Sequence, residues 1–60
     1  MNEFCIGDSV LCHSLGSWVD GKKGIVINLF IQSSDGINGH LIQMDHGVTV
    51  LPPYCLTKVE

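Results

Sequence analysis

The side chains best suited to chemistry in this chain are three thiols and three imidazoles, the groups that zinc prefers as ligands. They belong to Cys5, Cys12, His13, His40, His46 and Cys55. None of the pairs has the two-residue spacing of a zinc knuckle. Cys12 and His13 are neighbours, so a strand would turn the thiol and the imidazole to opposite faces, which is wrong for a catalytic pair. We therefore predict reduced cysteines and no metal, cofactor or catalytic residue; the alternatives are a zinc site and a disulfide between Cys5 and Cys55.

Basic side chains are few. Lys22, Lys23 and Lys58 stand against six acidic residues, and the formal net charge is −3 without any arginine. A surface that follows a phosphate backbone needs clustered Lys and Arg, so the charge disfavours nucleic-acid binding. The alternative is that Lys22 and Lys23 contact a phosphate while Trp18 or Tyr54 stacks on a base.

Length and composition place this chain among small cytoplasmic proteins. We expect residues 1–60 to form one domain, whose core must be small. The N-terminal residues lack the basic and then apolar pattern of a signal peptide, and no run approaches the roughly 20 apolar residues of a membrane span. Three cysteines are an odd number without the dense spacing of a secreted disulfide scaffold. We expect no contact with a membrane.

The positions of Val, Ile, Leu, Gly and Pro predict an all-β fold, in a chain that has no Ala and no Arg. We expect strands at 9–13, 23–31, 40–45, 48–51 and 57–59, with Val10 and Cys12 on the buried face of the first. Pro52 and Pro53 cannot continue a strand ladder, so a single 3₁₀-like turn is expected at 53–56.

Three further features are expected in the segments between these strands. Trp18, in the loop at 15–21, should cover the small core. Asp45-His46-Gly47 should form a hairpin turn with Gly47 in the left-handed conformation. Replacing Gly47 by Val should therefore cost more stability than the same change at Gly39.

The longest apolar run follows the glycine-bracketed turn at 21–24 and predicts a central strand with an exposed apolar face. Alternation places Val26, Asn28 and Phe30 on the other side from Ile25, Ile27, Leu29 and Ile31. If Val26 and Phe30 fill the core, four aliphatic side chains face outwards and predict contact with a protein partner or a second copy in a homodimer. Trp18 and Tyr54 are the other candidate contact residues. The alternative is a bulge that exchanges the two faces of the strand midway.

Two glycine-containing patterns resemble those of KOW and related SH3-like domains. Gly7-Asp8-Ser9-Val10 resembles G-D-x-V, and Gly21-Lys22-Lys23-Gly24-Ile25-Val26 resembles G-x-x-G-x-V. Met44-Asp45-His46-Gly47, followed by Pro53 and the ending at 56–60, is similar to small bacterial and phage SH3-like proteins. The resemblance covers nearly the whole chain and implies a five-stranded SH3-like barrel. It also implies binding to RNA or to proteins of the transcription and translation machinery, the known roles of KOW domains.

A second resemblance, to plasmid-encoded type II dihydrofolate reductases, rests on Gly7-Asp8, Trp18 and the segment 48–52. It implies an oligomeric reductase. The V-Q-I-Y signature of that family is not kept, because Thr49 and Leu51 stand where Gln and Tyr would be. We therefore predict a small non-enzymatic protein-interaction module or accessory subunit, with a KOW-type RNA-binding domain and the reductase as alternatives.

Overall fold

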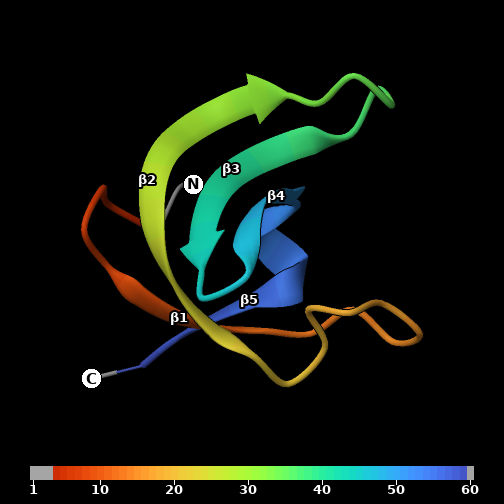
Figure 1. Ribbon diagram of the computed structural model, residues 1–60. Helices are drawn as coiled ribbons and strands as arrows, with labels where there is room; N and C mark the ends of the chain where they lie inside the picture. The colour runs from red at the N-terminus through yellow and green to blue at the C-terminus, as the bar shows by residue number, and fades with distance from the viewer. Residues whose placement is uncertain (1–3, 60) are drawn as a thin grey trace.

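The computed structural model describes residues 4–59, which form one antiparallel five-stranded sheet (Figure 1). Its elements are β1 (Ser9–Cys12), β2 (Lys23–Gln32), β3 (Asn38–Met44), β4 (Gly47–Leu51), the 3₁₀ turn η1 (Pro53–Cys55) and β5 (Leu56–Lys58). The prediction of an all-β fold with a 3₁₀ turn before the last strand is confirmed. The first three residues and Glu60, which belonged to the expected lead-in and ending, lie outside the described residues.

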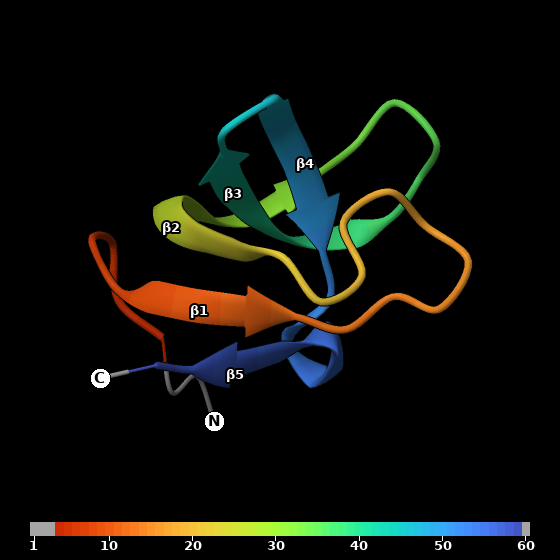
Figure 2. The ribbon, with the colours of Figure 1, turned by 60° about the horizontal axis from the view of Figure 1, so that its bottom comes forward.

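The strand order is β4-β3-β2-β1-β5, so β4 and β5 are the two edges of the sheet. The expected closure into a barrel is not found, because β4 and β5 do not pair within residues 4–59. Pro52 and Pro53 end the ladder of β4, and η1 then turns the chain so that the short β5 pairs with β1 instead. β2 curves between the β3–β4 hairpin and the β1–β5 pair, which run in clearly different directions (Figure 2).

The core is one cluster to which every strand contributes. Its buried hydrophobic residues are Phe4, Val10, Cys12, Val19, Val26, Ile42, Met44, Leu51 and Leu56. Val10 and Cys12 point inwards, as predicted for the first strand. The expectation that Trp18 covers the core is wrong: Trp18 is 52% exposed, and its neighbour Val19 is fully buried instead. A core this small has room for a valine below the loop, and the larger indole stays at the surface.

Two bulges divide β2. The strand pairs with β3 at Val26↔Ile42, then Asn28↔Leu41, then Ile31↔Gly39, so β2 carries one extra residue in each interval. A bulge of this kind bends the strand and changes which face its side chains occupy. The bulged alternative to regular alternation is therefore the one found.

The bulges redistribute the aliphatic side chains of β2. Ile25 and Ile27 remain exposed, whereas Leu29 packs against the core and Ile31 is half-buried. Phe30 was expected in the core but is 70% exposed. Its φ of 54° lies in the left-handed region that a bulky residue rarely adopts. Phe30 thus occupies a position that bulges usually give to glycine.

The β3–β4 hairpin is closed by a tight turn in which Met44 lies opposite Gly47. Gly47 has a φ of 144°, as predicted for a residue at positive φ. Gly39 has a different constraint, because a Cβ added there would collide with the backbone carbonyl of Leu51 and with the Pro52 nitrogen. The start of β3 passes so close to the end of β4 that only glycine fits.

Within residues 4–59, no helix has the length and apolar character needed to cross a bilayer.

The close approach at Gly39 reverses the expected order of glycine substitutions. We predict that Gly39→Ala destabilises the protein by roughly 3 kcal/mol, because the Leu51 carbonyl and Pro52 must move. Gly47→Ala should cost about 1 kcal/mol, since its new Cβ meets only backbone strain. Urea unfolding of both variants measures the difference. A larger loss at Gly47 would show that β4 can move away from Gly39 at little cost.

Candidate functional site

One face of the sheet, turned away from the core, carries several exposed or half-buried aliphatic side chains. Pairing places Ile25 beside Gln43 and Gln43 beside Val48, and places Leu41 beside Val50. Exposed Ile27 lies at the first bulge of β2. We call this the outer face and define it by five residues: Ile25, Ile27, Leu41, Val48 and Val50. Three of them, Ile25, Ile27 and Val48, are between 39% and 51% exposed.

The backbone of β4 presents a free edge beside the outer face. Met44 and Gly47 close the hairpin as a hydrogen-bonded pair, so residues 47, 49 and 51 bond to β3 and the intervening residues face away from it. The N–H and C=O groups of Val48 and Val50 therefore point outwards. Among the described residues, no backbone or side-chain group bonds to them. Unpaired groups of this kind form a template for an added strand.

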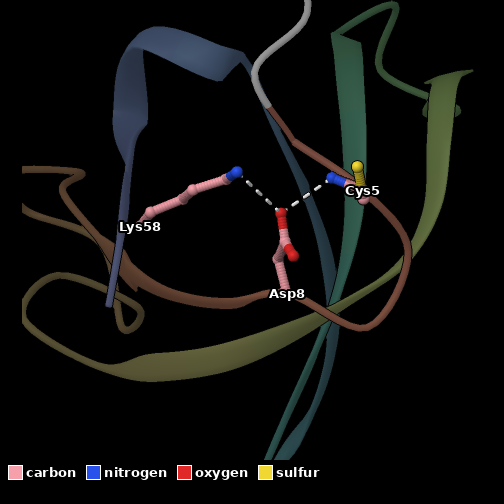
Figure 3. A network of polar contacts seen from close by, with 3 residues as sticks. All are labelled: Cys5, Asp8 and Lys58. Atoms are coloured by element: carbon pink, nitrogen blue, oxygen red, sulfur yellow. Dashed lines mark hydrogen bonds and ion pairs between the residues drawn. The ribbon is translucent and has the colours of Figure 1, made fainter. Parts of the chain in front are cut away.

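The other edge of the sheet is protected by charge. β5 has only three residues and ends in Lys58, whose Nζ lies 3.4 Å from Oδ2 of Asp8 (Figure 3). The Cys5 N–H donates to the same oxygen at 2.8 Å. This hydrogen bond, and to a smaller extent the Lys58 ammonium, lowers the pKa of the Asp8 carboxyl. A charged lysine on a short edge strand discourages pairing, so β4 is the accessible edge.

Two hollows lie at opposite ends of β4. The larger hollow, of about 490 Å³, is lined by Ser14, Ile37, Asn38, Val50, Leu51, Pro52, Tyr54 and Cys55. The smaller hollow, of about 140 Å³, is lined by Trp18, Lys22, Lys23, Met44, Asp45 and His46. Ser14 and Trp18 both belong to the loop between β1 and β2. This loop therefore contributes to both hollows.

His40 is a fully buried polar side chain that holds the second bulge of β2. Its Nδ1 accepts a hydrogen bond from the Phe30 N–H at 3.2 Å. The ring also meets the rings of Phe4 and Phe30 edge to face, with centroids 5.6 and 5.0 Å away. The imidazole thus fixes both the backbone and the ring of Phe30 and maintains its left-handed conformation.

The Phe30 hydrogen bond also determines the protonation of His40. Because Nδ1 accepts, the neutral ring carries its hydrogen on Nε2, which is buried without a hydrogen-bond partner among the described residues. Burial disfavours the charged imidazolium and lowers the pKa of His40 below its ordinary value of 6.5. Sequence reasoning treated this histidine only as a possible metal ligand and gave no indication of its role in the bulge.

The thiol and imidazole groups do not gather into one site. Within residues 4–59, no group of three or more His, Cys, Asp or Glu side chains could hold a metal ion. His13 Nε2 hydrogen-bonds the Thr57 hydroxyl at 2.8 Å. All three cysteines are free, and burial together with nearby Cys55 raises the pKa of the Cys12 thiol. A raised pKa keeps that thiol protonated and unreactive.

The structure distributes the candidate contact residues over separate surfaces. Ile25 and Ile27 lie on the outer face, whereas Leu29 turns to the core. Trp18, Lys22 and Lys23 line the smaller hollow, and Tyr54, 86% exposed, borders the larger one. The sequence analysis did not select Val48, Val50 or Ile37. Only the alternating V-T-V segment before Pro52 indicated that β4 could be an edge strand.

Comparisons with protein-family models, with curated proteins and with solved structures find no match to this chain.

The burial of His40 predicts a pH-dependent stability. Because its pKa is lower in the folded than in the unfolded chain, the unfolded chain binds more protons as the pH falls below about 6.5. We therefore expect the free energy of unfolding to decrease from pH 7 towards pH 5. His40→Gln should remove much of this decrease, whereas His46→Gln, at the exposed hairpin turn, should retain it. Equal pH slopes in urea titrations of the two variants would contradict this assignment.

Proposed function

We propose that the protein is a small non-enzymatic interaction module or accessory subunit that associates with a protein through its outer face. The observation that carries this proposal is the exposure of Ile25, Ile27 and Val48 on one face of the sheet. Exposed aliphatic side chains that gather on one face of a protein often mark an interface. A second copy of the chain is the simplest partner, because the same surface is then covered on both copies.

The size of the outer face limits the strength of self-association. Covering three half-exposed aliphatic side chains contributes on the order of 3 kcal/mol per copy, or about 6 kcal/mol for a symmetric pair. Association costs upwards of about 4 kcal/mol in lost freedom of motion. A homodimer built on this face should therefore be weak, and a larger host protein that adds contacts of its own would bind more tightly.

We predict that a small fraction of the protein forms a dimer at about 1 mM, and that Ile25→Lys or Val48→Lys abolishes it, because either change places a charge within the outer face. Sedimentation equilibrium over a range of concentrations measures the effect. Leu15→Lys is the matched control, since Leu15 is 96% exposed on the loop between β1 and β2 and lies outside the outer face. A monomer at every concentration would exclude self-association.

Nucleic-acid binding of the KOW type is a second candidate, supported by the smaller hollow. Trp18 lies there with Lys22 and Lys23, a combination that can stack on a base and contact a phosphate. Asp45 borders the same hollow, and its carboxylate would repel a phosphate. The observation favours at most weak binding.

We predict that a single-stranded RNA oligonucleotide binds with a Kd weaker than about 10 µM at physiological salt, because three lysines release few counterions. Fluorescence anisotropy, repeated at low salt, measures this directly. Submicromolar binding that is lost in a Lys22→Glu/Lys23→Glu variant would reverse the order of the two candidates.

A further inference from the structure

We propose that the free edge of β4 binds an extended peptide segment of a partner protein. The peptide pairs antiparallel with β4, places an apolar side chain in the larger hollow, and places an acidic side chain in the smaller one. This goes beyond the association proposed above, because it uses backbone groups and hollows that lie beside the outer face.

The backbone of β4 provides the pairing groups. Val48 and Val50 together present two N–H donors and two C=O acceptors that face away from β3. An antiparallel partner strand would satisfy all four with two of its own residues. Pro52 lacks an N–H and Pro53 begins η1, so the ladder cannot extend past Leu51. The binding register is therefore confined to a short segment.

The loop between β1 and β2 selects a single extended segment rather than a folded domain. Ser14 lines the larger hollow together with Leu51 and Pro52, and Trp18 lines the smaller hollow together with Asp45 and His46. The loop thus borders the hollows at the two ends of the free edge. An edge strand within a folded sheet would bring its neighbouring strands against the loop, whereas an isolated peptide would not.

The two hollows indicate which kinds of side chain suit the two ends of the peptide. Ile37, Val50 and Tyr54 give the larger hollow an apolar character that suits an aliphatic or aromatic side chain. The smaller hollow holds two of the three lysines of an acidic chain, opposed only by Asp45. Lys22 and Lys23 therefore favour an acidic side chain, and the Trp18 ring borders the same space.

Antiparallel pairing orders these features along the peptide. Its amino-terminal end lies at the larger hollow, beside the end of β4, and its carboxyl-terminal end lies at the smaller hollow, beside the hairpin turn. At about 3.3 Å per residue, an apolar residue opposite Leu51 is followed four and five residues later by residues opposite Gly47 and His46. Those two positions should be acidic.

The probe that tests this is the acetylated and amidated hexapeptide LTVTDD, added to the ¹⁵N-labelled full chain. In the free protein the Val48 and Val50 amides should exchange rapidly with solvent, whereas the Thr49 amide, bonded to β3, should be protected. Saturating peptide should slow exchange at Val48 and Val50 at least tenfold and shift the Lys22, Lys23 and Tyr54 signals.

Two matched controls separate the backbone from the charge contribution. LTVTKK keeps the strand but reverses the charges, and should bind about tenfold more weakly because its lysines meet Lys22 and Lys23. Lys22→Glu/Lys23→Glu should reverse this preference, with its fold confirmed by an unchanged spectrum elsewhere. The Ile25→Lys variant, which disrupts the outer face, should bind the peptide normally.

Three results would overturn the proposal. They are the absence of binding by LTVTDD at millimolar concentration, shifts confined to the outer face, and equal affinities for LTVTDD and LTVTKK. Loss of self-association in the Ile25→Lys variant with peptide binding retained would leave both proposals standing separately. The experiments can therefore contradict either proposal without contradicting the other.

Discussion

The fold depends on the bending of β2, because this strand pairs with both β1 and β3 around a single small core. Its two extra residues produce that bend. The second bulge would be costly without support, since Phe30 must adopt a left-handed conformation that a bulky residue avoids. The His40 imidazole supplies this support by accepting the Phe30 N–H and packing against its ring. The curvature of the sheet thus depends in part on the buried His40 side chain.

Much of the secondary structure could be predicted from the sequence because its causes are local. Pro52 and Pro53 determine where β4 ends. The presence of a glycine at the hairpin turn predicted a positive φ there, and Gly47 has one. A bulge in this strand was expected only as an alternative, and the number and positions of the bulges could not be predicted, because they depend on the register between β2 and β3. Phe30 carries no sequence signal for its conformation, since the residue expected there is glycine. The prediction that Trp18 covers the core was wrong for a related reason, because the volume of the core is set by all strands together.

The candidate surfaces were predicted only in part, and for the same reason. Ile25 and Ile27 were selected by alternation and do lie on the outer face, but the bulges return Leu29 to the core. The contribution of Val48 requires knowledge that β4 is an edge and lies next to Gln43. The approach of Trp18, Lys22 and Lys23 to the hairpin turn at Asp45 and His46 depends on the packing of the β1–β2 loop, which no local pattern encodes.

β4 links the two proposed interactions, because Val48 and Val50 belong to both. Their side chains form part of the outer face, and their N–H and C=O groups form the free edge. A peptide strand added at that edge would turn every second side chain to the same side as Val48 and Val50. Apolar residues at those peptide positions would extend the outer face, whereas charged residues would interrupt it. The sequence of a bound peptide would therefore determine whether strand addition strengthens or weakens association through the outer face.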